Sequence, residues 1–210
     1  MTNLEGPAKS KEDILREKIA NVSKRLDRIG GEMDPGIVET VALVNLLGFP
    51  TNNSCEGHTD HGMANPWVRI TAPGEPEYTH VGEREEKERI AASYGMQAGD
   101  IERGKNDTAD EAYYSWLRDN DVPFTPEFES WRALQDAEFQ KAKALVNEFN
   151  AGRHDAEAIR FERGHITAGV DEQVEASTDM EGLPARLEAR REVMRAFTEF
   201  LRQKYQGTLY

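Results

Sequence analysis

Apolar side chains recur at helical spacing in three long stretches of the chain. Positions three and four residues apart, with charged residues between them, predict amphipathic helices over residues 11–29, over residues 126–149 and from Pro184 onward. Gly30 and Gly152 follow the first two stretches, which suits the positions just after a helix. These three segments therefore supply most of the predicted helix.

The stretch from Ile37 to Leu47 is apolar on nearly all sides, which predicts a buried helix. Asp34 suits the capping position before the first turn, and Pro35 suits the first helical position. Gly48 suits the position after the last turn. We therefore expect a helix that begins just after Asp34 and ends at Leu47.

Shorter stretches carry the residue types and the alternation of strands: residues 51–55, 67–71, 158–162 and 165–170. The first two would form a hairpin-like unit around a polar loop. Arg163 and Gly164 provide a turn between the last two. The chain is therefore predicted to be an α+β protein, in which a small antiparallel sheet packs against several amphipathic helices.

Residues 74–126 differ from the rest because they are charged, contain glycines and are weakly periodic. We expect a charged helical insertion with a helix near residues 84–94, a mobile middle and a short aromatic segment around Tyr113, Tyr114 and Trp116. The insertion could act as a lid, although a plain insertion is favoured. The predicted organisation is a disordered lead-in over residues 1–10, then a single domain over residues 11–210.

The charge of the chain excludes several classes of partner. The formal net charge is −13, and charged residues make up 31% of the sequence. Such a negative field disfavours non-specific binding to nucleic acid or to a membrane surface. The first residues lack the apolar stretch of a signal peptide, and no apolar run approaches the length of a membrane span. We expect a cytoplasmic protein whose one cysteine, Cys55, is reduced.

Basic residues gather in the last predicted helix, at Arg186, Arg190, Arg191 and Arg195. Acidic residues alternate with them, at Glu188, Glu192 and Glu199. This interleaving predicts an exposed face stabilised by ion pairs rather than a binding patch for an anion.

Candidate chemistry is concentrated in residues 51–62, TNNSCEGHTDHG, which contain the only cysteine and two of the five histidines. Cys55, His58 and His61 are each three residues apart, so a turn can bring them together. A thiolate and two imidazoles suit zinc, with Glu56, Asp60 or water as a fourth ligand. Zinc is therefore the candidate cofactor of this cluster.

The same cluster supports two other chemistries. Cys55 could be a nucleophile, because the neighbouring histidines would stabilise a thiolate. Alternatively, Glu56 and His58 could be an acid–base or anchoring pair, with the Gly57 amide near an anionic ligand. An ordinary polar turn capped by Asn and Ser side chains is a further alternative.

The predicted catalytic residues are thus Cys55, Glu56 and His58. Further residues in or near the cluster, or at the turn before residue 165, are expected to contact a ligand: Asn53, Ser54, Gly57, Asp60, Trp67, Arg163 and His165. Whether His80 or His165 reaches the cluster is left open by the sequence.

Residues 37–70 resemble a family of uncharacterised bacterial and phage-associated proteins. The resemblance is carried by the segment TVALVNLLGFPTNNSCEGHTDHGMANPWVRI, with its T-x-x-SCEGH turn and its PWV strand. The segment MRAFTEFL, which starts at Met194, is similar to the C-terminal end of that family. The match covers about a third of the chain and implies no established activity.

A weaker likeness connects the turn with the tRNA-modifying methyltransferases of wybutosine biosynthesis. That family has a Ser-Cys-Ser-Gly-Arg turn, to which Ser54, Cys55 and Gly57 correspond, whereas Glu56 and His58 depart from it. The change from arginine to histidine removes a fixed positive charge that would meet an anionic partner. The likeness therefore implies a fold, an α+β sandwich, and not methyl transfer.

The leading hypothesis is a cytoplasmic enzyme that acts on a small molecule or nucleotide-type ligand at residues 52–62. Two alternatives stay open: an acidic interaction protein that binds a protein partner or forms a homodimer, and a zinc-stabilised structural domain. The sequence contains no Walker, GxGxxG, nucleophile-elbow or HExxH motif.

Overall fold

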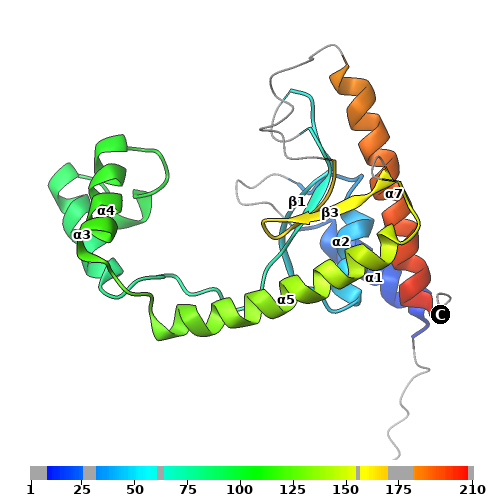
Figure 1. Cartoon of the computed structure of the whole chain (residues 1–210), viewed down its shortest axis with the longest axis horizontal. Helices are drawn as coiled ribbons and strands as arrows, with labels where there is room; N and C mark the ends of the chain where they lie inside the picture. Colours follow the sequence, from blue (N-terminus) through cyan, green and yellow to red (C-terminus); the bar gives the residue numbers. More distant parts are fainter. Residues whose placement is uncertain (1–8, 26–31, 61–63, 155–156, 170–181, 208–210) are drawn as a thin grey trace, which may run out of the picture. The chain divides into compact units, whose positions relative to one another are not determined.

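The structure is a computed structural model that describes residues 9–25, 32–60, 64–154, 157–169 and 182–207. Its helices and a four-stranded antiparallel sheet confirm the predicted α+β fold (Figure 1). The chain divides into two compact units, one formed by residues 1–72 and 137–210 and the other by residues 73–136. The predicted insertion, residues 74–126, lies within the second unit. Residues 1–8 of the predicted lead-in lie outside the described residues.

Helix α1 spans Lys11–Val22, and its first turn is capped by Ser10, whose hydroxyl accepts a hydrogen bond from the Asp13 amide at 3.1 Å. The periodicity predicted a longer helix, to residue 29. The structure ends α1 at Val22, and residues 26–31 lie outside the described residues.

Helix α2 spans Val38–Leu46 and begins later than the capping pattern predicted. Asp34 is not its N-cap. A turn closed by the bond from the Ile37 amide to the Asp34 carbonyl, 3.2 Å, precedes the helix. The predicted burial is correct, since six of the nine helix residues are buried: Val38, Thr40, Val41, Ala42, Leu43 and Val44. The Asp34 carboxylate is thereby released for contacts outside the helix.

The sheet has the strand order β1-β2-β4-β3, with every neighbouring pair antiparallel. Its strands confirm the predicted positions, although β2 and β4 end earlier than expected: Thr51–Cys55 (β1), Trp67–Ile70 (β2), Ile159–Glu162 (β3) and His165–Ala168 (β4). Arg163 and Gly164 join β3 to β4 with φ angles of 48° and 85°, as in a two-residue hairpin turn.

One face of the sheet packs against helices from both ends of the sequence (Figure 1). Helix α5 spans Pro126–Asn150, and helix α7 spans Leu183–Gln206, as the spacing of apolar residues predicted. Val68 and Ile166 from the sheet share a buried core with α2, the C-terminal half of α5 and α7. No helix among the described residues is both long enough and apolar enough to cross a membrane.

The second unit has its own small core. Helix α3 spans Glu83–Tyr94, the short 3-10 helix η1 spans Ala98–Asp100, and helix α4 spans Asp107–Asn120. The aromatic segment expected around Tyr113 is longer than predicted, because it belongs to a full helix, α4, that Asn106 caps. Residues of α3, α4 and the intervening loop form the core: Ile90, Ala91, Ile101, Ala109 and Tyr113.

Glu83, at the start of α3, is the buried charge of this unit, with 3% of its surface exposed. Burial alone would raise the pKa of Glu83. An ion pair with Lys87 at 2.7 Å and hydrogen bonds from the His80 and Thr79 amides outweigh burial and lower this pKa to about 2.

Candidate functional site

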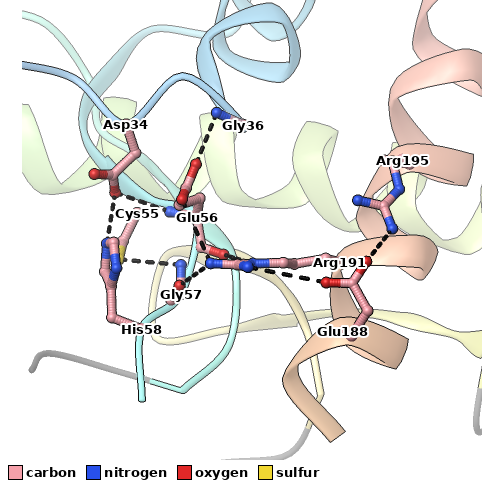
Figure 2. A network of polar contacts seen from close by, with 9 residues as sticks. All are labelled: Asp34, Gly36, Cys55, Glu56, Gly57, His58, Glu188, Arg191 and Arg195. Carbon is pink, nitrogen blue, oxygen red and sulfur yellow. Dashed lines mark hydrogen bonds and ion pairs between the residues drawn. The ribbon is translucent and has the colours of Figure 1, made fainter. Parts of the chain in front are cut away.

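Three side chains converge where strand β1 ends (Figure 2). Asp34 precedes α2, Cys55 is the last residue of β1, and His58 follows in the turn. Asp34 Oδ2 lies 3.1 Å from His58 Nε2. One carboxylate oxygen of Asp34, Cys55 Sγ and one ring nitrogen of His58 all lie within 4.8 Å of one another. This is the geometry of a candidate metal centre.

Asp34 is held in place by two donors. Its Oδ2 atom accepts a hydrogen bond from the Glu56 amide at 3.1 Å and contacts the His58 ring. Partial burial would raise the pKa of Asp34, but these two hydrogen bonds outweigh it and lower the pKa below the ordinary value. Asp34 is therefore an anionic carboxylate at neutral pH.

The Cys55 thiol is half-buried, and it lies beside a negative charge. Burial raises the pKa of Cys55 to about 11, and the Asp34 carboxylate adds to this shift. The Gly57 amide donates to Sγ at 3.3 Å, which opposes the shift without cancelling it. In the absence of a cation, the thiol is therefore protonated at neutral pH. Such a thiol is a weak nucleophile by itself.

Glu56 connects this turn to two other segments. Its Oε2 atom accepts a hydrogen bond from the Gly36 amide at 2.7 Å, and Oε1 lies 3.4 Å from Arg191 Nη2. A Cβ atom on Gly36 would lie 2.5 Å from Glu56 Oε2, so a larger residue there would displace this carboxylate oxygen. The carboxylate is engaged on both oxygens, which favours the anchoring role of Glu56 over a proton-transfer role.

Arg191 of α7 binds the turn from the opposite side (Figure 2). Its Nη2 atom donates to the Gly57 carbonyl at 2.7 Å, and its Nε atom donates to the Glu56 carbonyl at 3.2 Å. The prediction that all the α7 arginines form an exposed ion-paired face holds for Arg195, which pairs with Glu188 at 2.6 Å. It holds only in part for Arg191, which lies 3.9 Å from Glu188 but directs its hydrogen bonds to the carbonyls of the turn.

Arg190 also departs from that prediction. Only 8% of its surface is exposed, and its Nη1 atom donates to the Ala64 carbonyl at 3.0 Å. A Cβ atom on Gly169 would lie 2.7 Å from Arg190 Nε. This difference could not be predicted from the sequence, since two adjacent arginines in one helix look alike until the neighbouring loops are known.

Gly57 is the tightest point of the turn. Its φ angle is 83°, and a Cβ atom there would lie 2.7 Å from Leu187 Cδ1 and 2.9 Å from the Asn65 carbonyl carbon. Asn65 is itself buried, and its amide donates to the Thr167 hydroxyl at 2.6 Å. Glycine at this position therefore lets the turn lie close both to α7 and to the residues just before strand β2.

A cavity of about 110 Å³ adjoins the cluster. Ser54 lines it, and the Ser54 Oγ atom is buried without a hydrogen-bond partner among the described residues. Asn53 also lines it, and its side-chain oxygen accepts from the Ser54 amide at 2.9 Å. The remaining lining residues come from the segment between α1 and α2, from α2 and from β1: Arg25, Glu32, Met33, Asp34, Val41, Thr51 and Asn52.

Trp67 and His165 lie next to the cluster on the sheet. Trp67 is the cross-strand neighbour of Cys55, and its ring meets the His165 ring edge to face at a centroid distance of 4.9 Å. Burial and the nearby Arg69 lower the pKa of His165. His165 therefore approaches the cluster through Trp67, and it is not one of the three candidate ligands.

The other predicted residues are less closely connected. Asp60 is exposed, and Arg163 occupies the turn between β3 and β4. His61, the third predicted metal ligand, lies outside the described residues. His80 belongs to the second unit, where its Nδ1 atom lies 3.6 Å from Glu83 Oε2.

The site thus contains two contributors that the sequence did not identify as such, Asp34 and Arg191. Asp34 was assigned to a helix cap, and Arg191 to a solvent-exposed face. Comparison of the chain with protein-family models, with curated proteins and with solved structures finds no match.

Proposed function

We propose that this protein is a cytoplasmic metal-dependent enzyme that acts on a small molecule. A zinc-class divalent ion would be bound by Asp34, Cys55 and His58, with a further position open to water or substrate. The observation that carries the proposal is the grouping of the three donor atoms within 4.8 Å of one another. A reducing compartment suits it, because the single cysteine must remain a thiol to act as a ligand.

The distance between two of the donor atoms is compatible with a tetrahedral ion. Ordinary zinc–ligand distances and tetrahedral angles imply ligand atoms about 3.3–3.6 Å apart. The contact between Asp34 Oδ2 and His58 Nε2, 3.1 Å, needs only a small outward movement to accept an ion. Sulfur, imidazole nitrogen and carboxylate oxygen together match the ligand preferences of zinc better than those of magnesium or calcium.

The electrostatics favour a metal ligand over a free nucleophile at Cys55. Burial and Asp34 keep the thiol protonated at neutral pH in the absence of an ion, because the pKa of Cys55 is about 11. A divalent ion would displace that proton and neutralise both the thiolate and the Asp34 carboxylate. The nucleophile and the acid–base pair predicted from the sequence are therefore the weaker alternatives.

Three protein ligands leave a position open, as in catalytic rather than structural zinc sites. A bound ion would activate a water molecule or polarise a carbonyl or phosphoryl group of the substrate. The cavity beside Asp34 is lined by Ser54, whose buried hydroxyl has no partner among the described residues and is available to a substrate. At about 110 Å³, this cavity is smaller than the cavity of about 150 Å³ that accommodates benzene, so a substrate would place only a small group in it.

Glu56 and Arg191 would position the ligands without contacting the ion. Glu56 orients Asp34 through its amide, and Arg191 fixes the carbonyls on either side of Gly57. Such outer contacts commonly change metal affinity by 10- to 100-fold. Glu56, although it is the acid next to Cys55, would therefore be a positioning residue rather than a catalytic acid.

The test is direct metal binding by the full chain. The protein is stripped with a chelator, titrated with zinc, and then with cobalt, whose thiolate charge-transfer absorption reports a Cys55 ligand. We expect one ion per chain and a cobalt–thiolate absorption band for the unchanged chain. Both should be lost in Cys55→Ser, and the metal affinity should fall at least 100-fold in Asp34→Asn and in His58→Ala.

His80→Ala is the matched control, because His80 also lies beside a carboxylate but does not belong to the group of three donors. It should bind zinc as the unchanged protein does. Zinc binding that survives in Cys55→Ser, or that is absent from the unchanged chain, would overturn the proposal. A large fall in melting temperature on chelation, with no exchangeable water at the cobalt ion, would instead favour the zinc-stabilised structural domain.

A further inference from the structure

Strand β3 is an end strand of the sheet, and among the described residues it pairs with β4 alone (Figure 1). The β4 strand pairs with it along Ile159–Glu162. Such an edge presents backbone N–H and C=O groups to which another strand can bind.

Asn150 of α5 shows which backbone groups face outward. Its side-chain oxygen accepts from the Ile159 amide at 3.0 Å, and its amide donates to the Ile159 carbonyl at 2.7 Å. In an antiparallel sheet, both backbone groups of a residue point to the same side, and the side alternates along the strand. The N–H and C=O of Phe161, two residues further on, therefore point to the same outer edge.

A groove of about 510 Å³ runs beside that edge. Its lining comes from one face of α5 and from the whole of β3: Lys143, Val146, Asn147, Asn150, Ala158, Ile159, Arg160, Phe161 and Glu162. A water molecule occupies about 30 Å³ in the liquid, so this volume is far larger than single waters require. The groove has room for an extended segment of chain.

The charges of β3 identify the occupant. Arg160 and Glu162 flank Phe161, and their side chains are 41% and 42% exposed, with only a long contact of 3.8 Å between them. An exposed ion pair of that length contributes little to stability. In an antiparallel pair centred on Phe161, Arg160 would face Glu162 of the second strand, whereas a parallel pair would place like charges opposite each other.

We propose that β3 pairs with β3 of a second copy of this chain around a two-fold axis at Phe161. The two Phe161 residues exchange two backbone hydrogen bonds, and two Arg160–Glu162 ion pairs form between the copies. The ladder stops at Ile159, whose backbone groups Asn150 already binds. The result is an isologous dimer in which one continuous sheet crosses both copies. This inference is independent of the metal site.

Charge reversal tests the proposal, because it can both break and restore the pairing. Sedimentation equilibrium at physiological salt, over a wide range of protein concentration, should show a dimer for the unchanged chain. Arg160→Glu and Glu162→Arg should each weaken self-association at least tenfold. The double reversal, R160E with E162R, should restore it, since the strand is again complementary to itself.

Mixing the two single variants gives a second test. Arg160→Glu and Glu162→Arg are complementary to each other, so an equimolar mixture should form a dimer that neither forms alone. Arg84→Glu, at an exposed ion pair of the second unit, is the control and should not change the dimer. A monomer at every concentration, single reversals that leave the dimer intact, or a mixture that stays monomeric would each overturn the proposal.

Discussion

Replacing Gly57 by alanine should destabilise the first unit far more than the same change at Gly48. Both glycines lie in that unit and have similar positive φ angles, 83° and 91°. A Cβ atom at Gly48 meets nothing within 4 Å, whereas one at Gly57 meets Leu187 at 2.7 Å and the Asn65 backbone at 2.9 Å. The pair therefore separates backbone strain from steric overlap.

The magnitudes follow from these two effects. An alanine at positive φ costs about 1 kcal/mol, which applies to both variants. Overlap in a packed site adds about 1–3 kcal/mol, which applies to Gly57 alone. We expect losses in the free energy of unfolding of about 1 kcal/mol for Gly48→Ala and about 2–4 kcal/mol for Gly57→Ala.

Guanidinium denaturation, followed by far-ultraviolet circular dichroism, measures both values. The comparison is robust to separate unfolding of the two units, because both substitutions lie in the same one. Zinc affinity should also fall in Gly57→Ala, since the turn that positions His58 has to move. Equal losses of stability in the two variants would show that Gly57 is not tightly packed against Leu187 and Asn65, and would refute the proposed need for glycine in this turn.

Two further substitutions probe contacts made by charged side chains. In Arg191→Lys the charge is kept, but a lysine cannot bridge the Glu56 and Gly57 carbonyls, so zinc affinity in a competition titration should fall about tenfold. An unchanged affinity would show that Arg191 does not position the metal ligands. The pKa of Glu83 is about 2 in the folded protein and 4.5 for the free side chain, so the unfolded chain binds more protons between these two pH values. The stabilisation of the folded state by the ionised Glu83 is therefore complete above pH 4.5 and is lost as the pH falls to 2. That contribution is on the order of 3 kcal/mol. Acid unfolding of the second unit, followed by amide exchange, should therefore lose most of its pH dependence in Glu83→Gln. A profile in this variant equal to that of the unchanged chain would contradict the lowered pKa of Glu83.

Local patterns were sufficient to predict most elements of the fold. The apolar run from Ile37 to Leu47 requires burial whatever its neighbours are, and β1 follows from the break at Gly48. Helix α4 was missed because it buries only Ala109 and Tyr113, which is too few apolar positions to produce a periodic signal. Its stability depends on α3, and no pattern within its own residues reports that contact.

The candidate site was only half visible in the sequence. Cys55, Glu56 and His58 stand out because they are consecutive or nearly so. Asp34 lies 24 residues from His58, and Arg191 lies 135 residues from Glu56. At each of these two positions a local explanation, a helix cap or an ion-paired face, was adequate, so nothing in the local pattern required a distant partner.

The contact between Arg191 and the turn after β1 has a consequence for the newly made protein. Helix α7 is synthesised long after β1, so the Glu56 and Gly57 carbonyls lack the Arg191 hydrogen bonds until more than half of the sequence has been added. The N-terminal segments can collapse early, but the turn cannot take its final shape before α7 arrives. An unfinished chain on the ribosome should therefore lack the organised ligand set, and metal uptake should mark the completion of folding.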